Sequence, residues 1–288
     1  MLPFHDRPLS SRRHADRERC TPVSPWFLLV AGLCFAPDAC AWGLQTHVVF
    51  AQWTLAALPL ADPQVRAAAL RLPRLVLAGA CLPDLALAGR MLGLAAFRRA
   101  HQWSTLRRLA MACWDEERAI AVGYASHLLA DVVAHNRFVP DHEARIAHVP
   151  HVTHALCEWA MDQHVKPSLE VEPADLLSKE VCTLSEAAAR TFGCDQALAH
   201  RAIMFLGRAE RLLRATRLPQ LCRGAAGAFD SPEYFDGYVG SVQLLLRQIG
   251  AVLRGAEPSW QPEPDQATAK EAFAIIAPSA PPTITSLG

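Results

Sequence analysis

The chain has 288 residues, of which 51% are hydrophobic and 19% are charged, and its formal net charge is +0. A chain of this length and apolar content can bury one large core or two small ones. The balanced charge excludes a strong global field that would draw the protein to nucleic acid or to an anionic membrane, although a local basic groove stays compatible with it.

The first 41 residues have the order of a secretory signal. A polar, basic stretch over residues 5–20 precedes an apolar run over residues 26–36, and a bilayer-spanning helix needs a longer run, of roughly 20 residues. The sequence Ala-Cys-Ala then ends at residue 41, as before a signal peptidase cut. We therefore expect export to the periplasm or the medium, with a mature chain that begins at Trp42. A membrane anchor or a wrongly assigned start is the alternative.

Six of the nine cysteines lie after residue 41. An even number in an oxidising compartment permits disulfides, and Cys182 with Cys194 makes the most plausible short loop. The sequence contains no CxxC pair, which argues against a zinc knuckle built from thiolates.

From residue 42 on, apolar residues recur at helical spacing. Ala and Leu dominate where a strand would carry Val, Ile and Thr. No run of alternating β-branched residues and no internal repeat interrupts the pattern. The sequence therefore predicts an all-α fold, with a single multi-helix domain over residues 42–256. The segments with the clearest pattern are 42–76, 106–136, 151–165, 173–190, 195–217 and 231–255.

Two stretches invite a separate interpretation. Residues 85–97, LALAGRMLGLAAF, are apolar, and a packed helix is a simpler interpretation of them than a loop that inserts into a membrane. From residue 257 on, the composition shifts to Pro, Ala, Ser and Thr and lacks the apolar density of a core. The sequence predicts a disordered tail over residues 257–288.

Chemically useful residues first appear at a predicted corner, Cys81-Leu-Pro-Asp84. Pro83 cannot continue a helix, so Asp84 follows at the turn. Downstream, His127, Asp131 and His135 stand four residues apart and would project from one face of a helix.

A second helix carries His154 and Glu158 at the same spacing of four. Pairs of imidazole and carboxylate at i,i+4 offer two ligands to one metal ion. A single such pair is more often solvated, but the residues around His127 and Asp131 are apolar, and buried charges need partners or a metal. A metal site is therefore the better interpretation. The freed amine and carbonyl of Trp42 would chelate the same ion that His47 binds.

In these motifs and their order, the chain resembles the zinc-dependent phospholipase C family, which shares its fold and a trinuclear zinc site with fungal single-strand nucleases. The matching pieces lie in order between residues 42 and 162. They are WGLQTH, CLPD, the later His101, GYASHLLADVVAHN and HxxxE. The ordered set is far more specific than any one motif.

The resemblance implies up to three zinc ions, held by nitrogen and oxygen donors without thiolates, as suits catalytic zinc. In the family the counterpart of Asp131 bridges two ions, and that of Asp84 has been proposed as general base as well as ligand. The implied ligands are Trp42, His47 and Asp131 for the first ion, Asp84, His101, His127 and Asp131 for the second, and His135, His154 and Glu158 for the third.

One ligand is open to an alternative. In the best-known members the spacing from the bridging Asp to the next His differs from this chain, which offers His135 four residues later and His142 eleven later. We predict His135, because it shares the face of His127 and its AHN context resembles bacterial relatives, with His142 as the alternative. Asp162, one turn beyond Glu158, is expected to orient a ligand. The remaining histidines of this region are expected at the surface or in supporting positions; they are His148, His151 and His164.

The resemblance implies that the chain hydrolyses a phosphodiester with metal-activated water. Phospholipid is the favoured substrate. Base-binding nucleases need aromatic platforms, whereas this chain has only three tyrosines, and most of its tryptophans lie in helical patterns that favour core packing. Transient contact with a membrane surface would accompany this activity. The alternatives are a single-strand-type nuclease, for which nucleic acid would be the partner, and a non-catalytic, zinc-binding exported protein. The sequence says nothing about the oligomeric state.

Overall fold

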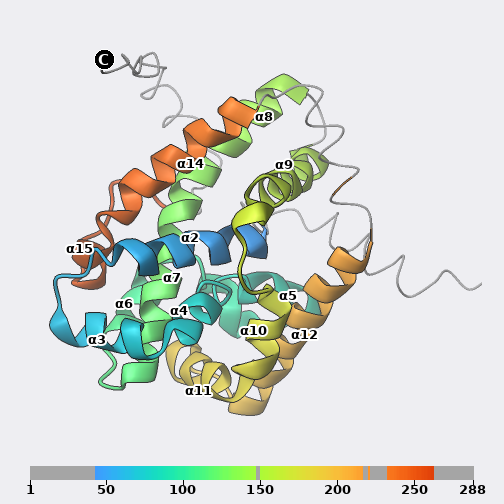
Figure 1. Ribbon diagram of the computed structural model, residues 1–288. Coiled ribbons are helices and arrows are strands. Elements are labelled where there is room, and N and C mark those ends of the chain that lie inside the picture. The colour runs from blue at the N-terminus through green and yellow to red at the C-terminus, as the bar shows by residue number, and fades with distance from the viewer. Residues whose placement is uncertain (1–42, 147–149, 217–219, 221–231, 263–288) are drawn as a thin grey trace, which may run out of the picture.

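The computed structural model describes residues 43–146, 150–216, 220 and 232–262. It describes their side chains except those of residues 143–146, 150–156 and 232. Within these ranges every regular element is a helix (Figure 1), which confirms the predicted all-α class. The predicted signal segment and residues 263–288 of the predicted tail lie outside the described residues.

From α2 to α12, the described helices follow one another through short connections (Figure 1). In chain order they are α2 (Leu44–Ala57), α3 (Pro63–Arg71), α4 (Pro73–Gly79), α5 (Leu85–Leu92), η1 (Ala95–Arg99), α6 (Trp103–Ala110), α7 (Asp115–Val133), η2 (Ala134–Phe138), α8 (Val139–Ile146), α9 (Pro150–Val165), η3 (Lys166–Ser168), α10 (Pro173–Lys179), α11 (Val181–Phe192), α12 (Gln196–Ala215), α14 (Pro232–Leu246) and α15 (Ile249–Leu253).

Helix α7 lies at the centre of the fold. Helices α2, α3, α4, α6, α14 and α15 all pack against it. From Ala119 to Val133 its residues are buried on every side, as expected for a helix segment that packs against neighbours all round. This confirms the expectation that the helix carrying His127 and Asp131 is buried, and it takes both side chains into the interior.

Two glycines allow α4 and α7 to touch backbone to backbone. A Cβ atom at Gly123 would lie 1.8 Å from the Val76 carbonyl oxygen, and one at Gly79 would lie 2.4 Å from the Ile120 carbonyl oxygen. No side chain fits at either distance, so glycine is required for this crossing. The close approach brings the carbonyl of Ala80, just after α4, against His127.

The pattern predicted for residues 106–136 is not one continuous helix. Helix α6 ends at Ala110 and α7 begins at Asp115, with Trp114 between them in extended backbone. Asp115 and Glu116 stand in the first turn of α7, where negative charge stabilises the helix N-terminus. Apolar spacing continues through the break, so periodicity alone could not locate it.

The predicted disulfide between Cys182 and Cys194 is wrong. Both cysteines are free, and they stand at opposite ends of α11. The intervening helix separates them by about 15 Å, whereas the Cα atoms of a disulfide lie within about 7 Å.

The chain still packs against the helices beyond residue 256. Trp103 donates from Nε1 to the Trp260 carbonyl oxygen at 3.3 Å, and Asn136 donates from Nδ2 to the Gln261 carbonyl oxygen at 3.0 Å. The packed part therefore extends past the predicted start of the tail. Within the described ranges, none of the helices combines the length and the apolar character that a bilayer crossing requires.

Candidate metal centre

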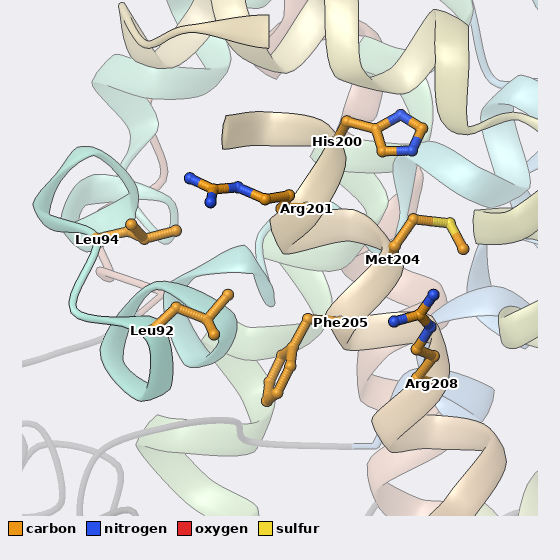
Figure 2. Close-up of a pocket in the computed structure, with 7 residues that line it drawn as sticks. All are labelled: Leu92, Leu94, His200, Arg201, Met204, Phe205 and Arg208. Atoms are coloured by element: carbon orange, nitrogen blue, oxygen red, sulfur yellow. The ribbon is translucent and has the colours of Figure 1, made fainter. Parts of the chain in front are cut away.

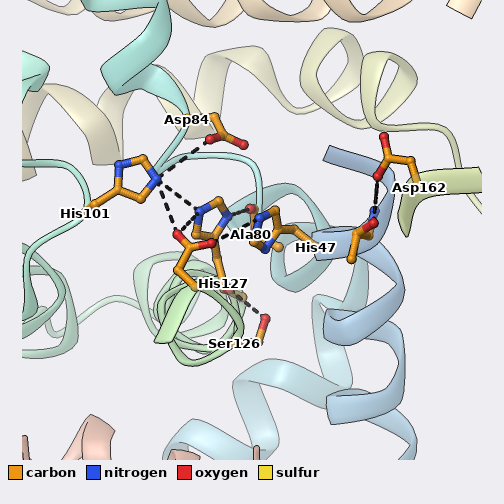
Figure 3. Close-up of polar contacts among 10 residues, drawn as sticks. His47, Ala80, Asp84, His101, Ser126, His127 and Asp162 are labelled. Atoms are coloured by element: carbon orange, nitrogen blue, oxygen red, sulfur yellow. Dashed lines mark hydrogen bonds and ion pairs between the residues drawn. The ribbon is translucent and has the colours of Figure 1, made fainter. Parts of the chain in front are cut away.

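Five predicted ligands converge in the core from four parts of the chain (Figure 3). His47 comes from α2, Asp84 from the turn before α5, His101 from the turn before α6, and His127 and Asp131 from α7. All five side chains are buried.

Asp131 stands in the middle of this cluster. Its Oδ2 atom lies 2.9 Å from His127 Nε2 and 3.4 Å from His101 Nε2, whereas its Oδ1 atom lies 3.4 Å from His47 Nε2. His101 Nε2 also lies 3.7 Å from Asp84 Oδ1. The two oxygens of one carboxylate thus face different imidazoles, which is the arrangement that a bridging ligand needs.

The spacing of these donors fits zinc. Donor atoms of His47, Asp84 and His127 lie within 4.8 Å of one another, and so do those of His101, His127 and Asp131. Tetrahedral zinc with bonds near 2.0–2.2 Å separates its ligand atoms by about 3.3–3.5 Å. The distance of 3.2 Å between His101 Nε2 and His127 Nε2 is close to that value.

The hydrogen bond of His127 gives a second test of fit. Its Nδ1 atom lies 2.7 Å from the Ala80 carbonyl oxygen. Because a carbonyl oxygen can only accept, Nδ1 carries the hydrogen and donates the hydrogen bond. In the neutral ring, Nε2 then turns a lone pair toward Asp131 Oδ2. This contact is repulsive unless a proton or a cation lies between the two atoms. Metal-binding histidines commonly use such a backbone carbonyl to fix their tautomer.

The pKa shifts of the imidazoles follow from burial and neighbouring charge. Burial lowers the pKa of His101 well below its ordinary value, and His127 and Arg90 lower it further, which favours the neutral form that binds metals. Burial also lowers the pKa of His127, but the Asp131 and Asp84 carboxylates outweigh it and leave that pKa raised.

Burial is the main influence on the pKa values of the carboxylates Asp131 and Glu158. Burial raises the pKa of Asp131, although His127 opposes the shift. Burial raises the pKa of Glu158 in α9 well above its ordinary value, with further contributions from Asp84, Asp162 and Asp131. The negative charges of the cluster therefore act on the pKa of Glu158. A divalent cation would stabilise the ionised form of all these groups.

Comparison with known proteins identifies the family. A model described as zinc dependent phospholipase C matches residues 46–202, more than half of the chain, and the match includes every residue of the cluster described above. The chain belongs to the zinc-dependent phospholipase C family. It is a zinc-binding hydrolase of the phospholipase C type. Neither the curated proteins nor the solved structures yield a match.

Turns hold two of the family's predicted ligands in place. Asp84 immediately precedes α5, but its side chain makes no capping bond to that helix. The carboxylate faces His101 instead. Next to His101, Tyr124 of α7 donates its hydroxyl to the Ala100 carbonyl oxygen, and Thr105 Oγ1 donates to the Arg99 carbonyl oxygen at 2.6 Å.

Asp162 anchors the start of α2. Its Oδ1 atom accepts hydrogen bonds from Thr46 N at 2.9 Å and Thr46 Oγ1 at 2.7 Å, and its Oδ2 atom pairs with Arg214. A Cβ atom at Gly43 would lie 2.1 Å from Asp162 Oδ2. The carboxylate thus fixes the backbone turn directly before His47. Asp162 thus contacts the residue next to His47 in the chain, and its role in orienting a ligand stays a prediction.

The third predicted ion rests partly on residues outside the described set. Trp42 of the first site and the side chain of His154 lie outside it, as do the side chains of His148 and His151. Glu158 is buried in α9. His135 is half-buried in η2, a π-helical turn, and such turns recur at functional sites.

The alternative ligand His142 is buried in α8 among aromatic rings. Its Nδ1 atom donates to the Phe138 carbonyl oxygen at 2.8 Å, and its ring centre lies 4.3 Å from that of Phe138 and 5.2 Å from that of Tyr234. The carbonyl contact fixes the tautomer of His142 as it does at His127, and the surrounding rings pack His142 into the core. Near the end of α9, His164 pairs with Asp236 at 2.8 Å.

Sequence reasoning missed several residues that position the ligands. The signal for Gly123 was a glycine inside a buried helix, which often marks a close backbone approach. Tyr124, Ala80 and Arg214 act through contacts across 24, 47 and 52 residues of sequence, for which no local pattern exists.

Proposed function

We propose that the protein hydrolyses phospholipids at the phosphodiester, releasing diacylglycerol and a phosphorylated head group. The observation that supports this most is the position of Asp131, whose two oxygens face His47 on one side and His101 and His127 on the other. Family membership supports the reaction type.

In this proposal up to three zinc ions bind. When bound, zinc supplies positive charge beside the phosphate oxygens and lowers the pKa of a water molecule near the phosphorus. Asp84 accepts the proton of the attacking water at one oxygen, while its other oxygen faces His101. The proposed ligands are Trp42, His47 and Asp131 for one ion, Asp84, His101, His127 and Asp131 for the next, and His135, His154 and Glu158 for the third.

Two of the three tyrosines, Tyr124 and Tyr238, favour phospholipid over nucleic acid as the substrate, because both are buried. Tyr124 is buried, and its hydroxyl bonds to the Ala100 carbonyl oxygen. Tyr238 is buried too, and its hydroxyl donates a hydrogen bond to Asp141 Oδ2. Rings used in this way cannot stack on bases, which is how single-strand binders hold their ligand.

Export is part of the proposal. Cleavage after Ala41 would place the new terminus one residue before Gly43, whose backbone is held against Asp162. We expect that Ala41→Arg, which blocks the cut, leaves two zinc ions where the processed protein holds three. Metal analysis of both forms, with N-terminal sequencing, measures this. Equal zinc content in the processed and unprocessed forms would contradict a role for the Trp42 amine.

The function is tested in two steps with the purified, processed protein. First, hydrolysis of a soluble chromogenic phosphodiester should stop with a chelator and return with added zinc; absence of turnover at full zinc loading would favour a non-catalytic zinc protein. Second, phosphatidylcholine micelles should be cleaved faster than single-stranded DNA. The reverse preference would replace the phospholipase assignment by the nuclease.

A further inference from the structure

A pocket of about 450 Å³ lies on the surface between α12 and the turn that joins α5 to η1 (Figure 2). Apolar side chains from both elements line it, together with two arginines of α12. We call it the Leu92 surface. Its residues in this argument are Leu92, Leu94, Arg201, Met204, Phe205 and Arg208.

The turn presents Leu92 in a fixed shape. Leu92 is the last residue of α5, and Gly93 follows in the left-handed conformation, with φ of 69°. Gly93 N donates to the Arg90 carbonyl oxygen at 3.2 Å, and Leu94 N donates to the Gly89 carbonyl oxygen at 2.6 Å. The Leu92 side chain is nevertheless 41% exposed. A well-defined tip therefore presents a large apolar group to the surroundings.

The arginines beside the tip lack anionic partners among the described residues. Arg201 and Arg208 stand two turns apart on one face of α12, and no carboxylate lines the pocket. No ion pair joins either of them to another residue in the described ranges, whereas Arg211 pairs with Asp175 and Arg214 with Glu210 on the same helix. The local charge is therefore positive although the whole chain is neutral.

We propose that the Leu92 surface docks on an anionic phospholipid bilayer. Leu92 enters the boundary between head groups and acyl chains, while Arg201 and Arg208 contact lipid phosphates. An apolar tip flanked by cations matches the layered chemistry of a bilayer surface. The inference rests on the proposed phospholipid substrate and adds the face of the molecule that meets it.

The position of the tip relative to the metal centre fits this role. Helix α5 starts directly after Asp84 and ends at Leu92, a length of about 12 Å. Docking at Leu92 therefore brings lipid head groups to a distance from Asp84, a predicted zinc ligand, of about the length of α5. One leucine and two arginines give weak, reversible attachment, as suits an enzyme that must move between substrates.

The test is co-sedimentation of the zinc-loaded protein with vesicles. We expect binding to phosphatidylcholine vesicles that contain phosphatidylglycerol, little binding to pure phosphatidylcholine, and weaker binding at high salt. Arg201→Ala and Arg208→Ala should each weaken the binding about five-fold. Leu92→Ser should weaken it about three-fold or more, since less apolar area is buried in the bilayer.

Matched controls come from the last turn of α14 and the residue that follows this helix. Leu244, which is 60% exposed, and the exposed Arg247 carry the same chemistry outside the Leu92 surface. Leu244→Ser and Arg247→Ala should bind vesicles like the wild type. Thermal melting of each variant checks that it is folded.

Three results would overturn the docking surface: no binding to anionic vesicles, equal binding to neutral and anionic vesicles, or equal losses in the control variants. Sedimentation does not depend on turnover. A wild-type protein that hydrolyses the soluble phosphodiester but ignores vesicles therefore contradicts the docking surface alone. A protein that binds vesicles through these residues but hydrolyses no ester contradicts the proposed function alone.

Discussion

At the scale of single residues, Asp131 is the centre of the metal site. Its carboxylate lies between the imidazoles of His47, His101 and His127. The i,i+4 spacing predicted its pairing with His127. It could not predict the contacts with His47 and His101, because these depend on how α2 and the turn before α6 pack against α7.

Asp131→Asn should remove most of the zinc and nearly all of the activity. The amide nitrogen cannot serve as a ligand, so the bridge is lost while the shape is kept. Zinc per chain and turnover of a soluble phosphodiester measure the effect. Asp195→Asn is the matched control: Asp195 caps α12, and asparagine caps equally well. Unchanged zinc stoichiometry in Asp131→Asn would reject the bridging role.

Substitution of His135 and His142 decides which of these two histidines is a zinc ligand. We expect His135→Gln to lower the zinc content and the activity. His142→Gln should keep its zinc and instead lower the stability, because it disturbs the packing against Phe138 and Tyr234. Metal analysis and melting of both variants measure this. Loss of zinc in His142→Gln alone would reverse the assignment.

At the scale of elements, helix periodicity predicted most of the helical segments but not how they meet. The break between α6 and α7 lies inside an unbroken apolar pattern. The π-helical turn η2 follows α7 without any signal in the spacing. Close crossings such as that of α4 with α7 depend on the absence of side chains at Gly79 and Gly123, which becomes visible only once the partner helix is in place.

Gly123→Ala should destabilise the protein by about 2 kcal/mol or more, because the new methyl group overlaps the Val76 carbonyl. Urea unfolding measures the change. Gly237→Ala in α14 is the matched control: no atom lies near its added methyl group, so the helix should gain up to about 1 kcal/mol. Equal, small effects of the two changes would contradict the close crossing.

Helix α12 carries a buried acid with a pH signature. Burial raises the pKa of Glu210 from 4.5 to about 6, although Arg214 opposes the shift. Between these values the folded chain holds a proton that the unfolded chain releases, so the contribution of Glu210 to stability falls as the pH rises through this window, by about 2 kcal/mol at most.

Urea unfolding from pH 4 to 7 compares the wild type with Glu210→Gln, which has no such proton. The stability of the wild type relative to the variant should decrease between pH 4.5 and 6 and stay level outside this range. A relative stability that rises with pH, or stays constant, would contradict the raised pKa.

At the scale of the whole molecule, the sequence predicted the all-α class and the family, because both depend on periodicity and on an ordered set of motifs. The assembly of the site was harder to predict. Its ligands come from α2, α7 and two turns, and residues remote in sequence hold them, such as Asp162 at Gly43 and Tyr124 beside His101. Packing decides those contacts, and packing is a property of the folded chain.

Zinc binding by the buried cluster around Asp131 is tested most directly by anomalous X-ray scattering at the zinc edge, from crystals of the purified, processed protein. We predict a zinc peak with bonds of about 2.0–2.2 Å to His101 Nε2, His127 Nε2 and an Asp131 oxygen, and a second peak bonded to His47 and the other Asp131 oxygen. A map without an anomalous peak among these side chains, from protein crystallised with zinc, would contradict the account.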